Sequence, residues 1–423
     1  MTQQKGALMD AVQRQLMSCL AAYRTGSCVT VLQPDFCAPD RWQKLYRLAT
    51  VHKLAPVVFE TMRCLSAFCD TEPELLKAWK KETFLQAAGQ AMRTQCIVRV
   101  SEMLTQNQIP HAVVKGILCR ALYKKPDVRI SGDEDLLIDA ADVERCHQLL
   151  EQNGIELMDG VGGDDVTHWK DKKTGLHIEL HTQLFSSKRA EDAVLNQVFS
   201  EQLHHTVIAA LPEGNVQTLH PTYHFVFLVC HALKHFLTGG FGIRMICDII
   251  SFAEQYREEI HHQTAYILLE RVNARKFLDQ LLSVGQDWLA FDPKENGWSF
   301  SEKPDAGDLL QDSLDAGIYG QSTMSRKHSA GIIMQAAEGQ SLKSSTLSAV
   351  FPNRERMQGK YPVLKKKPVL LSLCWAHRLG KYAVEVIHTK KNGNSPVESV
   401  ALGKKRTEMM VKYGVLPKNK KKN

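Results

Sequence analysis

The sequence predicts an α+β protein in which a small mixed β-sheet core is flanked by helical N-terminal and C-terminal regions. Three observations predict this class. Apolar residues follow helical spacing over residues 8–105, strand-like and helix-like segments alternate over 109–184, and helical spacing returns from Thr222 to about Ala290. With 423 residues, of which 44% are apolar, the chain is long enough for two or three domains with buried cores.

These patterns divide the chain into four parts. We expect a helical N-terminal region over residues 1–105, the sheet-bearing core over 106–200, a helical domain over 201–345 and a basic C-terminal segment over 346–423. In the first part, Leu75, Leu76 and Trp79 illustrate the helical spacing of apolar residues.

The first two strands of the core are each followed by a helix. A β-branched run from Ile109 ends at Lys115-Gly116 and precedes a helix-like segment over 117–124. The second strand, 132–139, precedes a helix from Ala140 to Gln152, which Asn153-Gly154 closes.

The third predicted strand follows a long connection. The residues after Gly154, through Gly160 to Asp165, are rich in glycine and charge, so we expect a turn-bearing connection there. Apolar and polar residues alternate from Leu176 to Leu184, which is the pattern of a half-buried strand.

Several features favour a cytoplasmic protein without a membrane partner. The first residues lack the charged-then-apolar profile of a secretory signal, and no stretch approaches the roughly 18 apolar residues of a membrane span. Eleven cysteines occur without a Cys-x-x-Cys pair, so we expect reduced thiols and neither a disulfide framework nor a cysteine zinc site.

Charge is unevenly distributed along the chain. The net charge is +7, but residues 341–423 hold 19 Lys and Arg against 4 Glu, whereas the remainder holds 34 basic against 42 acidic residues. The basic segment either binds a polyanion, with Trp375 and Tyr382 interleaved among its cations, or is a solvated end rich in lysine.

Three carboxylates form a candidate site. Asp133 and Asp135 stand two residues apart on the second predicted strand, so both side chains project from one face, roughly 7 Å apart along the chain. Glu179 lies on the third strand and would meet them if the two strands pair. Asp-x-Asp alone is also common at polar strand ends, so the order of the surrounding elements carries the interpretation. Such oxygen ligands suit Mg²⁺.

The order of these elements resembles the DNA polymerase beta type of nucleotidyltransferase. The sequence is similar to a bacterial nucleotidyltransferase family whose members are mostly named only by that activity. The similar segments are Val114 to Gly116, Leu122-Tyr123, Arg129, Gly132 to Ile138, His177 to His181, His231-x-x-x-His235, Gly242 to Arg244, Asp248-Ile249, Phe351-Pro352, Tyr361-Pro362, Trp375-x-x-Arg378 and Gly403 to Gly414.

The resemblance implies a nucleotidyltransferase core over residues 106–200 and an NTP as substrate. Asp133, Asp135 and Glu179 would be the catalytic residues and the metal ligands. They would hold two Mg²⁺ ions, with Mn²⁺ as an alternative. The enzyme would move a nucleoside monophosphate to an acceptor that is a small molecule, a protein or a nucleic acid.

Lys115, Gly116 and Arg129 are the candidate nucleotide-binding residues. The wider superfamily usually has Gly-Ser where this chain has Lys115-Gly116, so the lysine would meet phosphate charge while the glycine lets the backbone approach closely. Arg129 either binds the leaving phosphate, pairs with a carboxylate or is an exposed loop residue. Glu134 replaces the aliphatic residue usual in the family, which implies that the opposite face of its strand is not fully buried.

Histidines and one charged pair complete the candidate residues. His177 and His181 flank Glu179 and either orient it by hydrogen bonds or act as a base on the acceptor. His231 and His235 share a helix face with His224 and either bind metal, line the substrate cleft or pack structurally. Arg244 and Asp248 stand four apart on the next helix, where they either pair with each other or lie at the cleft and support the site residues.

Two other functions remain open from the sequence. The basic C-terminal segment would suit a protein that binds or modifies nucleic acid, and a non-catalytic nucleotide-binding scaffold would keep the same fold. Three intact carboxylates argue against the scaffold, because burying such a cluster without a metal is unfavourable.

Overall fold

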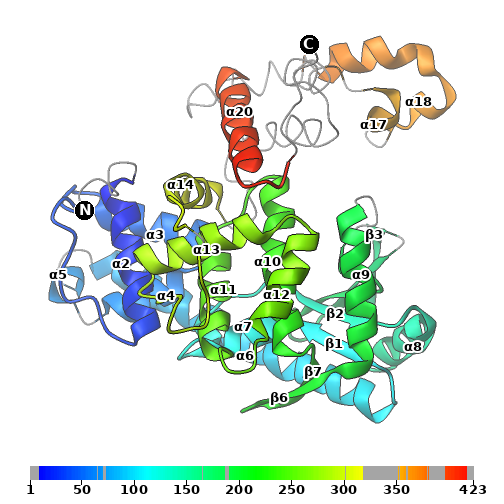
Figure 1. Ribbon diagram of the computed structural model, residues 1–423, viewed down its shortest axis with the longest axis horizontal. Coiled ribbons are helices and arrows are strands. Elements are labelled where there is room, and N and C mark those ends of the chain that lie inside the picture. The colour runs from blue at the N-terminus through cyan, green and yellow to red at the C-terminus, as the bar shows by residue number, and fades with distance from the viewer. Residues whose placement is uncertain are drawn as a thin grey trace. The chain divides into compact units, whose positions relative to one another are not determined.

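The computed structural model describes two compact units (Figure 1). The described residues are 9–63, 65–69, 73–163, 165–185, 190–300, 302–317, 351, 353–358, 361–378, 380 and 396–416. The first unit comprises Met1–His231 and Ile243–Gly307, and the second comprises Ala232–Gly242 and Asp308–Asn423. The four-part division drawn from the sequence stays a prediction.

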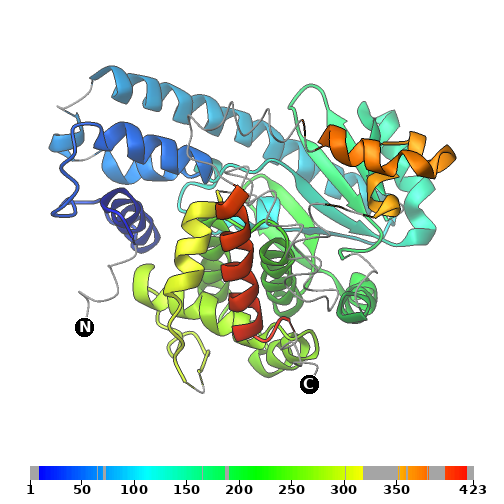
Figure 2. The ribbon, with the colours of Figure 1, turned by 90° about the horizontal axis from the view of Figure 1, so that it is seen from above.

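The chain begins with the predicted helices. Asp10 and Gln13 form a capping box at the start of the first of them, and aromatic rings pack between them, with 5.1 Å between the ring centroids of Trp42 and Phe68. The last of these helices extends from its neighbours to the sheet (Figure 2). They are α2 (Ala11–Thr25), α3 (Arg41–Val51), α4 (Ala55–Met62), α5 (Ser66–Cys69) and α6 (Pro73–Gln106).

A five-stranded mixed sheet forms the centre of the first unit. Its order is β1-β2-β5-β4-β3; β2 and β5 run parallel, and the other neighbours are antiparallel. The α+β class predicted from the sequence is confirmed. The strands are β1 (His111–Val114), β2 (Glu134–Ile138), β3 (Ile155–Gly163), β4 (Val166–Asp171) and β5 (His177–His181).

The connection predicted after Gly154 is wrong, because it forms β3 and β4. These strands pair as a hairpin, and Trp169 of β4 is fully buried in the core. Glycine and charge are tolerated here because β3 lies at the edge of the sheet, where one side of the strand has no partner strand.

A second hairpin, β6 (Val207–Leu211) and β7 (Gly214–Thr218), lies within the part predicted to be a helical domain. At Gly214 φ is +141°, and an added Cβ would lie 2.6 Å from Cγ1 of Val98 on α6. This glycine therefore serves both the turn and the close approach to the helix. Val216 of β7 joins the main core.

The core packs one face of the sheet against α6 and α8 (Val143–Gln152). Ile97 of α6, Leu150 of α8 and Ile178 of β5 are fully buried in it. The remaining helices of the first unit are α7 (Gly116–Ala121), α9 (Ala190–Gln202), α10 (Pro221–Leu237, in this unit up to His231), α11 (Ile243–Gln255), α12 (His262–Arg271) and α13 (Arg275–Trp288).

The second unit is held around a buried arginine. Arg406 is 0% exposed, lies 3.3 Å from Asp312 and donates to the carbonyls of Phe236 and Thr238. This residue of the basic segment is therefore paired inside the unit. Tyr382 and Lys418 to Lys422 lie outside the described residues. The helices here are α14 (Gly307–Ala316), α17 (Arg354–Gln358), α18 (Val363–Lys366) and α20 (Pro396–Lys412).

No helix among the described residues combines the length and apolar character needed to cross a membrane.

Candidate active site

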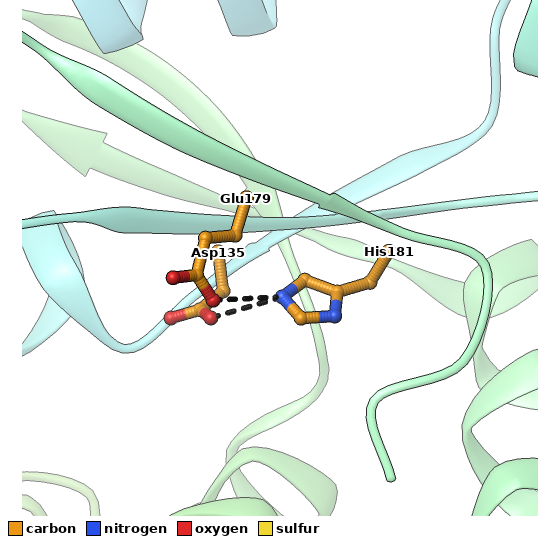
Figure 3. A group of neighbouring side chains, drawn as sticks. All are labelled: Asp135, Glu179 and His181. Carbon is orange, nitrogen blue, oxygen red and sulfur yellow. Dashed lines mark hydrogen bonds and ion pairs between the residues drawn. The ribbon is translucent and has the colours of Figure 1, made fainter. Parts of the chain in front are cut away.

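The parallel pairing of β2 and β5 brings two of the predicted carboxylates together (Figure 3). Asp135 is the direct register partner of Glu179, so both side chains leave the same face of the sheet. His181 follows on that face, and its Nε2 lies 3.1 Å from Oδ1 of Asp135 and 3.5 Å from Oε2 of Glu179. Within the described part of the chain, these three form the group whose potential metal-ligand atoms all lie within 4.8 Å of one another.

Lys115 joins Asp133 to this group. Its Nζ lies 3.0 Å from Oδ2 of Asp133 and 2.5 Å from Oδ2 of Asp135. Asp133, just before β2, therefore contacts the lysine, whereas His181 contacts the other oxygen of Asp135 and links it to Glu179. The predicted phosphate-binding lysine is engaged by carboxylates in this structure.

The charges of this cluster shift one another's ionisation. Burial alone would lower the pKa of Lys115, but Asp135 and Asp133 raise it above its usual range. Burial alone would raise the pKa of Asp135, but Lys115 and His181 hold it below its usual range. Hydrogen bonds to Asp135 and Glu179 outweigh burial and raise the pKa of His181 to about 9. Without a metal ion, therefore, Asp135 is ionised and His181 is protonated at neutral pH.

The backbone of Lys115 is strained. Its φ is +64° and its ψ is −122°, a conformation that non-glycine residues rarely adopt. Its N–H donates to Nε2 of His224 on α10 over 3.0 Å. Because Nε2 accepts, the proton of the neutral ring sits on Nδ1, which donates to Oγ1 of Thr218, and that hydroxyl donates to the carbonyl of Val113.

Burial keeps His224 neutral, because it lowers the pKa of the ring to about 3. The ring therefore remains an acceptor for the strained N–H over the physiological pH range. The sequence pattern places His224 on one helix face with His231 and His235 and assigns it no other role. Nothing in that spacing indicates a contact with Lys115, which lies 109 residues away.

The expectation for Glu134 is wrong. Its side chain is 1% exposed, accepts from Nη1 of Arg120 over 2.6 Å and accepts the N–H of Ile117 over 2.7 Å. The opposite face of β2 is therefore fully buried, and a guanidinium neutralises its acid. An added Cβ at Gly116 would lie 1.8 Å from Oε2 of Glu134, which explains the glycine. Its predicted role in binding nucleotide stays a prediction.

Arg129 and Asp248 form a buried bidentate ion pair. Nε and Nη2 of the arginine lie 2.8 and 2.6 Å from the two carboxylate oxygens, and Tyr123 donates to the same carboxylate. Arg129 is 2% exposed, which excludes the exposed-loop interpretation and leaves the predicted phosphate contact without support.

Asp248 pairs with Arg129 rather than in the predicted way. The carboxylate of Asp248 is bound by Arg129 and not by Arg244, its i, i+4 neighbour. Arg244 donates to the carbonyl of Ile130. The guanidinium of Arg129 binds more strongly because it presents two donors to the carboxylate of Asp248 at once.

The other predicted histidines lie in different places. His177 is on β5, and burial, then Lys170 and Arg93, lower its pKa. His231 lies close enough to Asp135 for its charge to lower the pKa of that carboxyl. His235 belongs to the second unit, and its predicted role stays a prediction.

The sequence interpretation missed a further histidine beside the site. His168 is the register partner of Glu179 on β4, and its Nδ1 lies 3.9 Å from Oε1 of that glutamate. It was missed because the residues of β4 were assigned to a connection.

A cavity of about 470 Å³ lies at the carboxyl ends of β2 and β5. Its polar lining includes Asp139, Asp165, Thr182, Gln183 and Asn196, the last from α9. The sequence makes His231 and His235 of α10 candidates for the wall of the substrate cleft. This cavity is walled by α9, although α10 does supply His224 and His231 beside the carboxylates.

A mixed sheet with carboxylates gathered on one face is compatible with several classes of enzyme, and a comparison with family models identifies the class. A model described as "Uncharacterised nucleotidyltransferase" matches residues 38–290, more than half of the chain. The chain belongs to this uncharacterised nucleotidyltransferase family. No curated protein matches the sequence.

Two solved structures are similar at low identity. One is an antigenic nucleotidyltransferase-like protein from Paracoccidioides brasiliensis, with 18% identity, 45% of this chain and 92% of that chain covered, and a TM-score of 0.28. The other is a tRNA nucleotidyltransferase complexed with a primer tRNA and an incoming ATP analog, with 15% identity, 69% and 99% covered, and a TM-score of 0.19. Neither similarity supports an argument about function, because both TM-scores lie below 0.5.

Proposed function

We propose that this protein is a metal-dependent enzyme that moves a nucleoside monophosphate from an NTP to an acceptor, with a catalytic centre of the DNA polymerase beta type. The observation that carries the proposal is the register pairing of Asp135 with Glu179 on parallel strands. It gathers carboxylates on one sheet face in a chain of a nucleotidyltransferase family.

The side chains present suit a divalent cation. Asp135 and Glu179 offer oxygen atoms, His181 offers a nitrogen, and Oδ2 of Asp135 is buried. Mg²⁺ or Mn²⁺ fits such a set. When bound, a divalent ion neutralises charge on the reacting phosphates.

The other residues have separate tasks in this proposal. Lys115 stands at the carboxylate cluster with its side chain 16% exposed, where it can meet the triphosphate. Asp133, 25% exposed, is the carboxylate placed to take the proton of the acceptor hydroxyl. Through its bond to Lys115 N–H, His224 positions the lysine and does not touch the substrate.

The acceptor is a small molecule, a protein or a nucleic acid, and we expect the reaction to take place in the cytoplasm. The cavity at the ends of β2 and β5 offers a place for it, because both strands lead there from Asp135 and Glu179. Its aspartates and amides suit an acceptor rich in hydroxyl or amino groups.

Label transfer tests the proposal. The purified full chain is incubated with each α-labelled NTP, Mg²⁺ or Mn²⁺ and cell extract, and the label is followed into an acceptor. We expect transfer by the wild type and loss in Asp135→Asn and Glu179→Gln. The matched control is Glu156→Gln, which changes a half-exposed carboxylate outside the cluster. Equal transfer by the site variants, or none by the wild type with any NTP, would contradict the proposal.

A further inference from the structure

Asp135 presents its two oxygens to two different surroundings. Oδ1 faces Nε2 of His181 over 3.1 Å, on the side where Glu179 lies. Oδ2 faces Nζ of Lys115 over 2.5 Å, on the side where Asp133 lies. A site for two ions would need a cation on each side of this carboxylate, because a shared carboxylate bridges such ions.

The side of Oδ1 is shaped for an ion. Oδ1 of Asp135 and Oε2 of Glu179 lie 3.1 and 3.5 Å from the same nitrogen of His181. Neighbouring ligands around one ion with bonds of about 2.1 Å are about 3 Å apart. Two of the three distances are therefore already close to the spacing of ligands around a single ion, and all three atoms lie within 4.8 Å of one another.

The side of Oδ2 already holds a cation. Nζ of Lys115 lies within 3.0 Å of both Asp133 and Asp135. The lysine backbone is fixed in its strained conformation by the hydrogen bond from its N–H to His224. This bond fixes the point from which the flexible side chain starts, and the two carboxylate contacts hold its ammonium in place.

We infer that this centre takes one divalent ion, held by Asp135, Glu179 and His181, and that the ammonium of Lys115 stands between Asp133 and Asp135 in place of a second ion. The inference rests on the proposed function, because the ion would serve the nucleotidyl transfer proposed above. It replaces the two-ion expectation drawn from the sequence. Because one of the three ligands is an imidazole nitrogen, the site should bind Mn²⁺ more tightly than Mg²⁺, which takes oxygen ligands in near-ideal octahedral geometry.

Counting bound Mn²⁺ tests the inference without any turnover. Free Mn²⁺ is titrated into the metal-free full chain and followed by its electron paramagnetic resonance signal, with no nucleotide present. We expect one tight ion in the wild type and two in Lys115→Met. Lys115→Gly should also bind two, and it relieves the backbone strain in case the first variant folds poorly. The control Lys172→Met removes an exposed lysine that pairs with Glu156, and should bind one.

A second arm tests the histidine. His181→Gln should weaken Mn²⁺ binding at least about tenfold and reduce the preference for Mn²⁺ over Mg²⁺, because the nitrogen ligand is lost. Equal Mn²⁺ affinity in this variant would remove His181 from the ligand set.

The outcomes separate this inference from the proposed function. No tight ion or two ions in the wild type, or a single ion in both Lys115 variants, overturns the inference. If the wild type binds one ion and Lys115→Met binds two, the inference stands even if no NTP is turned over, and only the proposed function fails. Label transfer by a wild type that binds two ions would overturn the inference alone.

Discussion

The two faces of strand β2 carry buried acids in opposite ways. On one face Glu134 is matched by one guanidinium and one backbone N–H, from Arg120 and Ile117. On the other face Asp133 and Asp135 share the ammonium of Lys115, and Glu179 adds a third carboxylate. We call the first face closed, because its one acid is matched by one cation, and the second face open, because it gathers three carboxylates around one ammonium and His181.

Three consecutive residues therefore differ in role. Glu134 stabilises the fold, whereas Asp133 and Asp135 belong to the candidate active site. A matched buried pair fixes β2 against α7, and breaking it leaves an uncompensated charge. A surplus of carboxylates with a strained lysine is typical of functional sites, where ionisation is perturbed for a purpose. Variants on the two faces should therefore differ in what they lose.

The largest loss of stability is expected on the closed face. Arg120→Met leaves the carboxylate of Glu134 buried without its cation and should lower the free energy of unfolding by about 3–5 kcal/mol. Urea unfolding at neutral pH measures this. In the double variant Arg120→Met/Glu134→Gln most of the loss should be recovered, because no charge is left unpaired. A loss below about 1 kcal/mol in the single variant would show that the face is not closed.

Asp135→Asn should lose both stability and activity. Mutual repulsion of carboxylates, considered from the sequence alone, predicts a variant as stable as the wild type or more stable. The structure reverses this sign, because Lys115 and His181 stabilise the ionised form of Asp135. We expect a loss of about 2–3 kcal/mol in urea unfolding and a fall in label transfer on the order of 10²-fold or more.

Asp133→Asn is the matched comparison on the same face. Asp133 is 25% exposed and contacts only one side of the cluster, through Lys115, so its loss of stability should be smaller. A free energy of unfolding above that of the wild type for Asp135→Asn would restore the repulsion argument.

The neutral imidazole of His224, which accepts the N–H of Lys115, predicts that the stability of the protein depends on pH. The pKa of His224 is about 3 in the folded protein and about 6.5 in an unfolded chain. Its contribution is therefore complete above pH 6.5 and is lost as the pH falls, at up to about 1.4 kcal/mol per pH unit. His224→Gln keeps an acceptor for the N–H of Lys115 but does not titrate. Between pH 6.5 and 5 its free energy of unfolding should therefore fall by about 2 kcal/mol less than that of the wild type.

Urea unfolding at several pH values in the presence of a chelator measures this difference. The exposed His204 provides the control, since His204→Gln should retain the wild-type slope. Parallel slopes for the wild type and His224→Gln would mean that His224 does not hold its proton-free form in the folded state.

The smallest effect is expected away from both faces. Deleting residues 417–423 removes four lysines and keeps Leu416, which is 7% exposed and bonded to Met410. The free energy of unfolding should change by less than about 0.5 kcal/mol, and NTP turnover without an acceptor should be unchanged. If the acceptor is a polyanion, its labelling should fall and depend less on salt. Loss of acceptor-free turnover would contradict this expectation.

The sequence predicted the carboxylates of the site better than their partners. The spacing of two residues predicted that Asp133 and Asp135 share one face of a strand, and the order of the elements predicted Glu179 on a neighbouring strand. The register of β2 with β5 agrees for Asp135 and Glu179. The contact between Lys115 and His224 joins residues 109 apart, and the pair of Arg129 with Asp248 joins residues 119 apart. Local periodicity contains no information about such contacts.

Strand prediction failed where burial was asymmetric. The hairpin of β3 and β4 carries glycine and charge because it lies toward the edge of the sheet, and only residues such as Trp169 show its buried side. Missing β4 also removed His168 from the expected site. Glu134 was misjudged because its neutralising partner, Arg120, was assigned to no site at all.

The close approach of Glu134 to Gly116 makes the effects of substitutions at these two positions interdependent. Glu134 is held by Arg120 and by the N–H of Ile117, so a side chain at 116 would have to displace an anchored carboxylate. A methyl group at 116 should therefore be tolerated better once position 134 carries a shorter side chain, although Arg120 would then lose its partner.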